Sequence, residues 1–347
     1  MKIYDLRTDT ITKPDEAMRK AIYEAECGDD VYMEDPTVNK LQEMAAEITG
    51  KEKSIFVSSG TMGNLIPMLI KGTRSKQMLL EEESHIMHYE LGGASSLAGI
   101  MTITTKADRG ILTKSIVEKY FAGHQPYFVS PINMVEVENS HNRHGGSVYP
   151  IEVLRELYQF TQSKNVHLHM DGARVFNASI AAKVPVKEIA SNTDSITFCL
   201  SKGLGAPMGA MICGEEEFIE EAFIMRKLIG GGMRQIGLMA AAGIYALQHN
   251  IEALEEDHIK AKKIAKTIVE AGIGTLDFEH VETNIVIADT EKTSEYIIGK
   301  LEELGVRASS FGEYKVRFVT HRDISLKEVD EACELIKKLN YNNINIH

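Results

Sequence analysis

Three apolar runs of the sequence are each followed at once by polar residues. Asp171 follows the run VHLHM, Lys202 follows DSITFCL after one serine, and a Ser-Gly-Thr turn follows SIFVS. In an open parallel sheet, ligands bind beyond the carboxyl ends of the strands. If these runs are parallel strands, the residues behind them are the first candidates for chemistry.

Lys202 and Asp171 form the most informative pair. A lysine held in a pocket behind a buried strand can have its pKa lowered by desolvation, which makes the amine nucleophilic; a solvated surface lysine is the alternative. A carboxylate nearby could pair with a protonated pyridine nitrogen. Together they suit pyridoxal phosphate (PLP), which needs an amine for its aldehyde and an anion that keeps the ring an electron sink. Asp171 could instead cap the helix that follows it.

Two further segments behind strands carry groups that suit a phosphate or a flat ring. Gly60 and Thr61 open a helical stretch, where backbone N–H groups and a hydroxyl could bind one phosphate; simple capping is the alternative. His85 could stack on a ring or move a proton near neutral pH, or it could be a hydrogen-bonded structural residue. Glu90 could share the pocket of His85, although taken alone it has the pattern of an exposed helix carboxylate.

Two arginines could bind a carboxylate group of a substrate. Arg174 stands three residues after Asp171, and Arg317 lies inside an apolar run at 315–319. A planar guanidinium offers paired N–H groups to two oxygens. An arginine within a strand is usually part of an ion pair, yet one that faces a cleft between domains fits a carboxylate site.

A rival of a different class uses the histidines of one strand. His167, His169 and Asp171 occupy alternate positions and would project from the same face. Such a set could bind a divalent metal in a hydrolase. The sequence contains neither HExxH nor CxxC, and His141 and His144 stand in a glycine-rich turn. A metal-dependent hydrolase therefore stays an alternative, beside the simpler expectation that His167 and His169 are buried and hydrogen-bonded.

The composition is that of an ordinary globular protein. The chain has 347 residues, 44% of them hydrophobic, and 38 Lys and Arg against 50 Asp and Glu give a net charge of −12. This charge would repel phosphate backbones, which argues against nucleic-acid binding. No run approaches the roughly 20 apolar residues of a membrane span, and the N-terminus lacks the pattern of a signal peptide. Four scattered cysteines favour a reducing cytoplasm.

Short apolar, β-branched runs alternate with segments of helical period, and this alternation predicts parallel strands joined by crossover helices. The fold class is therefore α/β, with a mostly parallel sheet flanked by helices in a large domain. An amphipathic helix is expected at 151–162. The expected strands lie at 54–57, 77–80, 100–105, 133–137, 166–170, 194–200 and 208–213.

The pattern changes after about residue 235. A long, Ala-rich helical segment runs to about 272 with an interruption near 249–250. Strands at 285–288 and 315–319 and helices at 294–304 and 326–339 follow it. We expect a large α/β domain at 1–250, which includes the N-terminal segment, and a smaller C-terminal α+β domain at 251–347.

Several phrases of the sequence occur in the order of one known family. They are DLRTDTITKP (5–14), GDDVYMEDPTVN (28–39), FVSSGTMGN (56–64), ENSHNRHGG (138–146), HMDGARVFNASIA (169–181), CLSKGLGAPMG (199–209), GGGMRQ (230–235) and VRFVTH (316–321). From residue 5 to about residue 321, the chain closely resembles the PLP-dependent threonine aldolases of the low-specificity and L-allo type. The resemblance implies the aspartate-aminotransferase fold (PLP fold type I), which agrees with two domains.

The resemblance also implies a role for each candidate at the cofactor. Lys202 would bind the aldehyde of PLP covalently, Asp171 would pair with the ring nitrogen, and His85 would stack on the ring. Gly60 and Thr61 would hold the phosphate. These are the catalytic and cofactor-binding residues that a member of this family needs, and PLP is the implied cofactor.

On the substrate side, the resemblance implies Thr8, Arg174 and Arg317 at the carboxylate of the amino acid, with Thr8 where a serine is common. Tyr32 and Glu90 would line the same pocket.

Three residues match positions that reach the cofactor site of a neighbouring subunit. They are Tyr32, Lys227 and Arg234. A homo-oligomer with shared active sites, either a dimer or a tetramer, is therefore implied.

One departure from the family concerns a second active-site histidine, which usually stands about ten residues before the ENSHN-like motif. Ungapped alignment places Phe128 there, and His124 is nearby but out of register. The expected reaction is retro-aldol cleavage of L-threonine or L-allo-threonine to glycine and acetaldehyde, with His85 or a water that it orders as the base. Phe128 leaves open another PLP lyase or a catalytically weakened homologue, and the preference between threo and allo substrates stays open.

Overall fold

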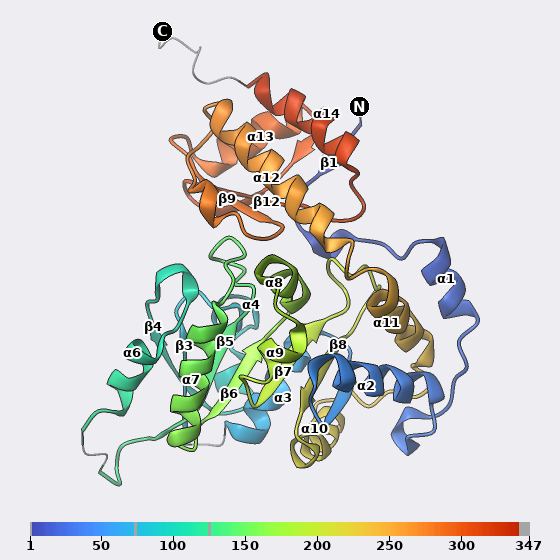
Figure 1. Cartoon of the computed structure of the whole chain (residues 1–347), viewed down its shortest axis with the longest axis vertical. Helices are drawn as coiled ribbons and strands as arrows, with labels where there is room; N and C mark the ends of the chain where they lie inside the picture. The colour runs from blue at the N-terminus through green and yellow to red at the C-terminus, as the bar shows by residue number, and fades with distance from the viewer. Residues whose placement is uncertain (1, 73–74, 124–125, 340–347) are drawn as a thin grey trace.

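A seven-stranded sheet lies at the centre of the larger domain in the computed structural model, which describes residues 2–72, 75–123 and 126–339 (Figure 1). Only β8 runs antiparallel to its neighbours in this described sheet; the other pairs are parallel. The mostly parallel sheet and each of its expected strands are thus confirmed. In sheet order the strands are β2 (Lys53–Val57), β8 (Ala210–Gly214), β7 (Ser195–Cys199), β6 (His167–Asp171), β5 (Ile132–Glu138), β3 (Gln77–Glu81) and β4 (Met101–Thr105).

Helices cover both faces of this sheet, which is why its strands read as nearly continuous apolar runs. Val135 and Val137 of β5 point into the core on one face, whereas Met134 points into the core on the other. The first face is covered by α1 (Glu16–Tyr23), α2 (Pro36–Thr49), α6 (Lys114–Val117), α7 (Ile151–Ser163), α8 (Val175–Ala182), α9 (Val186–Ala190) and α11 (Gly237–His249). The second is covered by α3 (Gly60–Lys71), α4 (His85–Tyr89), α5 (Gly93–Ser96) and α10 (Glu216–Leu228).

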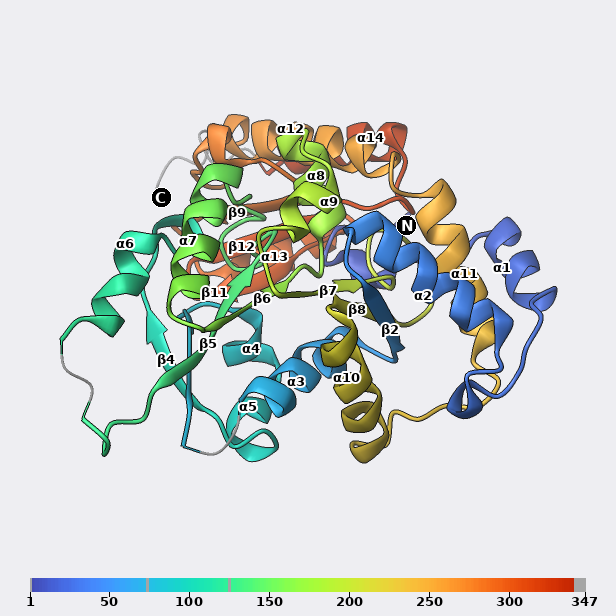
Figure 2. The ribbon, with the colours of Figure 1, turned by 60° about the horizontal axis from the view of Figure 1, so that its bottom comes forward.

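The smaller domain has its own sheet and its own apolar core. Strands β9 (Ile285–Asp289), β12 (Lys315–Val319) and β11 (Ser309–Gly312) form an antiparallel sheet in the order β11-β12-β9. Helices α12 (Leu254–Glu270) and α14 (Leu326–Lys337) lie side by side over this sheet as an outer layer (Figure 2). Helix α13 (Ser294–Glu303) packs against β10 (Val306–Arg307) and β11. The break between α11 and α12 matches the expected interruption near 249–250.

The N-terminal segment joins the smaller domain, although we assigned it to the larger one. Strand β1 (Tyr4–Asp5) pairs in parallel with β10 (Val306–Arg307), and Tyr4 and Leu6 are buried in the core of the smaller domain. A domain boundary near residue 250 stays a prediction. Short 3₁₀ helices connect the elements: η1 (Asp9–Ile11), η2 (Asp30–Tyr32), η3 (Asp108–Gly110), η4 (Glu118–Phe121) and η5 (Phe278–His280).

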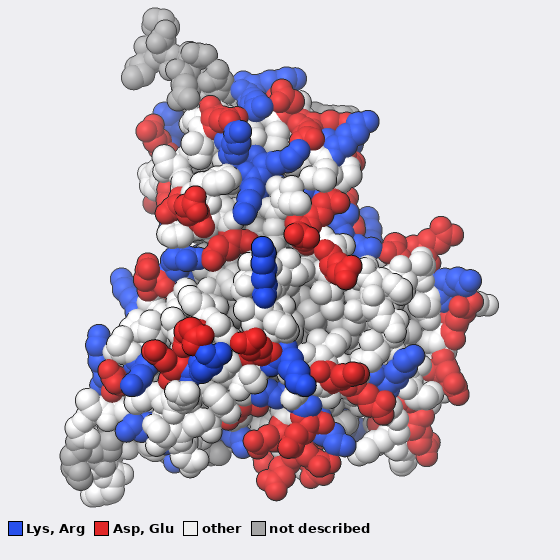
Figure 3. Space-filling model, in the orientation of Figure 1, with Lys and Arg blue, Asp and Glu red and all other residues white. Residues whose placement is uncertain are grey.

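The surface carries both charges. Over the face seen in Figure 3, Lys and Arg side chains are interspersed with Asp and Glu side chains on both domains (Figure 3). Attraction of an anion to this face therefore depends on local groups rather than on a broad field. None of the helices within the described ranges is long and apolar enough to cross a membrane.

Candidate active site

A cavity of about 380 Å³ lies between the two domains at the carboxyl ends of β6 and β7. From the larger domain it is lined by His85, Arg174 and Lys202, and from the smaller domain by Phe311 and Arg317. The location is the one expected for a ligand in an open parallel sheet. Because both domains contribute charged side chains, the cavity is a place where an ionic ligand would be held from two sides.

The structure brings most of the candidate residues to this cavity. Thr8, His85, Arg174, Lys202 and Arg317 line it directly. Asp171 and Glu90 are buried and interact with His85. The remaining candidates do not line the cavity of their own chain: Gly60, Thr61, Tyr32, Lys227 and Arg234.

Asp171 is a buried carboxylate at the end of β6. Its Oδ2 accepts a hydrogen bond from Asn64 Nδ2 at 2.8 Å, and its Oδ1 accepts one from the backbone N–H of Ala173 at 3.0 Å. Burial raises the pKa of Asp171, but the charges of His85 and Lys202 and these hydrogen bonds outweigh burial and hold it below its ordinary value. Asp171 is not the N-cap of α8, because Arg174 holds that position.

Lys202 follows β7, the neighbour of β6 in the sheet. Residues of the two strands lie in register, with Asp171 opposite Thr197. The backbone carbonyl of Lys202 accepts hydrogen bonds from Thr12 Oγ1 at 2.8 Å and from the Gly205 N–H at 2.9 Å. These bonds fix the main chain while the side chain reaches into the cavity. An amine and an ionised carboxylate therefore meet at the ends of adjacent parallel strands.

His85 and Glu90 form a hydrogen-bonded pair beside this carboxylate. His85 Nδ1 lies 2.8 Å from Glu90 Oε1, and Glu90 is only 4% exposed. The expectation of an exposed carboxylate at Glu90 is wrong, because α4 turns its end inward. Burial lowers the pKa of His85, but the bond to Glu90 and the charge of Asp171 outweigh burial, so the pKa is raised. With Nδ1 held by Glu90, Nε2 is the ring nitrogen left for a ligand.

Asn64 links these groups and was missed as a candidate. Its Nδ2 donates to Glu90 Oε1 and to Asp171 Oδ2, both at 2.8 Å. Its Oδ1 lies 3.4 Å from His169 Nε2. Asn64 belongs to the motif at 56–64, but only the packing of α3 against β6 and β7 shows that it ties the two carboxylates together.

The two arginines line the same cavity. Arg174 makes a paired contact with Asp9, from Nε and Nη2 at 2.7 Å each. Arg317 donates from Nη1 to Asn142 Oδ1 at 3.0 Å, and its buried Nε has no hydrogen-bond partner among the described residues. Burial and the neighbouring Arg174 lower the pKa of Arg317 to about 10, so it is still protonated near neutrality. Arg174 is therefore paired with Asp9, whereas Arg317 has no carboxylate partner among the described residues, which favours an additional anion.

Gly60 and Thr61 begin α3. The N-cap residue Ser59 accepts a hydrogen bond from the Met62 N–H through its hydroxyl at 3.2 Å, and Thr61 is exposed. A Cβ at Gly60 would lie 2.8 Å from the sulfur of Cys199, so glycine allows the helix to start against the end of β7. Free N–H groups at such a start suit an anion. The phosphate role of Gly60 and Thr61 stays a prediction.

The metal site proposed for the histidines of β6 is not formed. His167 Nε2 and His169 Nδ1 both contact Ser195 Oγ, at 2.7 and 2.8 Å, and burial lowers the pKa of His169 to about 4. Among the described residues, their ring nitrogens are not gathered with the Asp171 carboxylate; that carboxylate groups with His85 and Glu90 instead. The expectation of hydrogen-bonded histidines is confirmed for both, and that of burial for His169, whereas His167 is partly buried.

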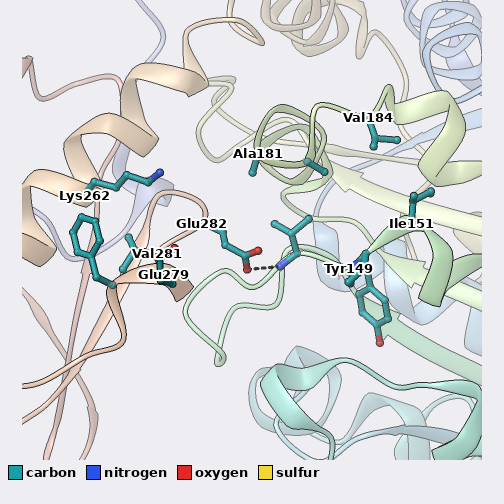
Figure 4. Close-up of a pocket in the computed structure, with 12 residues that line it drawn as sticks. Tyr149, Ile151, Ala181, Val184, Lys262, Glu279, Val281 and Glu282 are labelled. Carbon is teal, nitrogen blue, oxygen red and sulfur yellow. Dashed lines mark hydrogen bonds between the residues drawn. The ribbon is translucent and has the colours of Figure 1, made fainter.

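A second interdomain cavity of about 480 Å³ lies elsewhere (Figure 4). It is lined by groups such as Tyr149, Lys262 and Glu282, and the Val148 N–H donates to Glu282 Oε2 at 3.1 Å. It contains none of the candidate residues. The 380 Å³ cavity is therefore the candidate active site, because it combines an amine, an imidazole and two guanidinium groups, of which only Arg174 is paired with a carboxylate.

Comparison with known proteins gives one family. Residues 5–292 match the beta-eliminating lyase family. The chain is 40% identical to the low specificity L-threonine aldolase of Escherichia coli K12 over 334 residues, which cover 95% of this chain and 97% of the relative. It is 39% identical to low-specificity L-threonine aldolase 1 of Arabidopsis thaliana, over 95% of this chain and 94% of the relative.

A solved structure agrees in fold. The threonine aldolase of Leishmania major superposes with a TM-score of 0.83 at 18% identity, over 97% of this chain and 99% of that one. The resemblance seen in the motifs and the α/β architecture are thereby confirmed. The chain belongs to the beta-eliminating lyase family and, within it, to the threonine aldolases.

Proposed function

We infer that the 380 Å³ cavity is the active site of a PLP-dependent lyase that cleaves β-hydroxy-α-amino acids to glycine and an aldehyde, with L-threonine or L-allo-threonine as substrate. The observation that carries this function is the meeting of Asp171 and Lys202 at the ends of adjacent strands, beside a cavity that Arg174 and Arg317 also line. The amine thus reaches a cavity lined by both domains, with a buried carboxylate at the end of the neighbouring strand.

The donor set fits PLP. We propose that Lys202 binds its aldehyde, Asp171 its ring nitrogen and His85 one face of its ring, while Gly60 and Thr61 hold its phosphate at the start of α3. The ionised state of Asp171 supports its role, since a carboxylate is needed opposite a protonated ring nitrogen. When bound, PLP accepts the electron pair that bond cleavage leaves at the α-carbon.

Arg174 and Arg317 orient the substrate. A carboxylate that accepts hydrogen bonds from the free Nε of Arg317 balances the excess charge of the two guanidinium groups. Thr8 offers a hydroxyl at the same wall. Holding the carboxylate in one place fixes the direction of the Cα–Cβ bond, and orientation of this kind determines which bond breaks.

His85 is the proposed base for the β-hydroxyl. In this role Glu90 accepts a hydrogen bond from the Nδ1–H of His85, so Nε2 is free to take the hydroxyl proton directly or through a water. A well-placed general base contributes roughly 10² to 10⁴ in rate. Of the described residues that line the cavity, only His85 carries an imidazole. Phe128 is 75% exposed and does not line the cavity, and His124 lies outside the described residues.

We also propose a homo-oligomer, a dimer or a tetramer, in which neighbouring subunits share active sites. Tyr32, Lys227 and Arg234 are exposed, and Arg234 lies over the ring of Tyr32 and pairs with Asp29 at 2.8 Å. These side chains are exposed and do not line the cavity of their own chain, so they are accessible to a neighbouring subunit. Mixing inactive Lys202→Ala subunits with inactive Arg234→Ala subunits should restore activity; no restoration would refute sharing. A cytoplasmic location stays a prediction.

The direct test of the function is Lys202→Ala. We expect this variant to lose both the visible absorption of bound PLP and the release of aldehyde from L-threonine in a coupled assay. Lys20→Ala is the matched control, because Lys20 is 71% exposed on α1 and should change neither signal. Aldehyde release at the wild-type rate from Lys202→Ala would show that the function is wrong. The same assay with L-allo-threonine, serine and phenylserine defines the substrate range.

A further inference from the structure

A second group of potential metal ligands lies outside the active-site cavity. Glu81 ends β3, and His141 and His144 stand in the loop that follows β5. One ligand atom from each residue lies within 4.8 Å of the other two. No local pattern indicates this group, because 60 or more positions separate Glu81 from the histidines and no metal-binding spacing joins them.

The distances suit coordination better than hydrogen bonding. Glu81 Oε2 lies 3.3 Å from His141 Nε2 and 3.5 Å from His144 Nε2. Hydrogen bonds of this type are about 2.7 to 3.2 Å long. A tetrahedral Zn²⁺ with bonds of about 2.1 Å would place its ligand atoms about 3.4 Å apart. The two separations from Glu81 Oε2 therefore match edges of a zinc tetrahedron, and the third lies within 4.8 Å.

Both imidazoles lie at ion-pair distance from Glu81 without forming a hydrogen bond to it, and the side chain of His144 is 26% exposed. His141 is 1% exposed, and neither of its ring nitrogens has a hydrogen-bond partner among the described residues; the same holds for Nε2 of His144. Buried polar groups without partners are uncommon and costly. A cation between the two Nε2 atoms and the carboxylate would give both Nε2 atoms a partner at once, although not Nδ1 of His141.

The surrounding chain holds these side chains in place. Glu81 Oε2 also accepts a hydrogen bond from the Glu83 N–H at 2.7 Å, which orients the carboxylate. Gly110 lies against both rings, and a Cβ there would be 2.4 Å from His141 Cδ2 and 2.7 Å from His144 Cδ2. Glycine at this position therefore leaves room for the two imidazoles to converge.

His144 also lines a separate cavity of about 440 Å³ between the domains, which gives an ion a route from solvent and room for a water as fourth ligand.

We propose that Glu81, His141 and His144 bind one Zn²⁺ per chain. The ion ties the end of β3 to the loop that carries Asn142, which contacts both arginines of the active site. The zinc site does not depend on the proposed lyase function.

The test uses the full-length protein loaded with PLP, so that His85, Glu90 and Asp171 are occupied by the cofactor. After treatment with a chelator and dialysis against Zn²⁺, elemental analysis should find one Zn²⁺ per chain. Co²⁺ in its place should give visible d–d bands in the absence of amino acid. His144→Asn should weaken binding by roughly a hundredfold or more, since loss of outer contacts alone costs 10- to 100-fold.

Two further variants make the result decisive. Glu81→Gln keeps the volume of the side chain and should also lose the ion. His280→Asn is the control, because His280 lines the same 440 Å³ cavity but lies outside the ligand group, and it should keep one Zn²⁺ per chain. Wild-type protein that retains no Zn²⁺, or retention that is equal in wild type, His144→Asn and Glu81→Gln, would overturn the proposal and leave an ion pair between Glu81 and protonated histidine.

Discussion

Replacement of Arg317 by alanine tests how the site binds the carboxylate of its substrate. Arg317 Nη1 is engaged by Asn142 and Nη2 lies 3.3 Å from the backbone carbonyl of Arg7, whereas the buried Nε has no partner within the described chain. A substrate carboxylate can therefore accept a hydrogen bond from Nε and a second one from an adjacent Nη. Arg317→Ala removes both bonds and the charge.

The size of the effect follows from these contacts. A hydrogen bond to a charged group contributes about 1.5 to 3 kcal/mol, so two such bonds contribute about 3 to 6 kcal/mol. Removal of Arg317 also relieves its repulsion of Arg174, which favours the lower end. A loss of about 3 kcal/mol corresponds to a decrease in kcat/KM of about two orders of magnitude. Most of it should be an increase in KM, because the carboxylate is bound in both the ground state and the transition state.

The assay is aldehyde release from L-threonine over a range of concentrations wide enough to separate KM from kcat. Arg307→Ala is the control: Arg307 makes a half-exposed ion pair with Asp5 at 3.7 Å, and such pairs contribute about 0 to 1 kcal/mol. Arg317→Lys should recover only part of the loss, because an ammonium lacks the paired N–H groups. An unchanged KM in Arg317→Ala would refute the carboxylate role and leave this arginine a structural residue.

Three other predictions concern residues around the same site. Glu90→Gln removes a contact that raises the pKa of His85, so the pKa should fall and the acid limb of kcat/KM should move to lower pH; an unmoved limb would exclude His85 as the base. Asp9→Ala leaves buried Arg174 unpaired and should cost about 3 to 5 kcal/mol of stability, measured by denaturant unfolding beside Asp5→Ala, and an unchanged midpoint would contradict it. Burial raises the pKa of Asp9, but Arg174 lowers it to about 2. The ionised Asp9 should therefore contribute about 2 kcal/mol to the free energy of unfolding above about pH 4, and this contribution should be lost as the pH falls toward 2. Asp9→Asn should lack this pH dependence. Parallel acid-unfolding curves of the wild type and Asp9→Asn would disprove the prediction.

The strands of the large sheet and the reactive residues that follow them could be predicted from the sequence, because the patterns that indicate them are local. Apolar runs such as 54–57 and 166–170 pack on both faces of the sheet, so burial imposes their composition directly. Residues that follow such runs lie at the carboxyl edge in a parallel sheet, which is why Asp171 and Lys202 could be paired without coordinates. The motifs then indicated the family, and the comparisons confirmed it.

The polar partners of these residues could not be predicted in the same way. Asp9 and Arg174 are 165 positions apart, and Asn142 and Arg317 are 175 apart. No local periodicity relates such positions, because their contact depends on how the crossovers and the smaller domain close over the sheet. Contacts between distant segments also decide that β8 runs antiparallel, that Glu90 is buried, and that His167 and His169 bind Ser195 instead of a metal.

By itself, then, the sequence determined the type and place of the strands in the seven-stranded sheet, the amine and the carboxylate at their ends, and the family. The tertiary structure decided which charges are neutralised and which are left for a ligand. The physical reason is the sequence separation of the residues involved. An apolar face is formed by residues close together in the sequence, whereas a buried charge is paired only when distant segments of the chain come together.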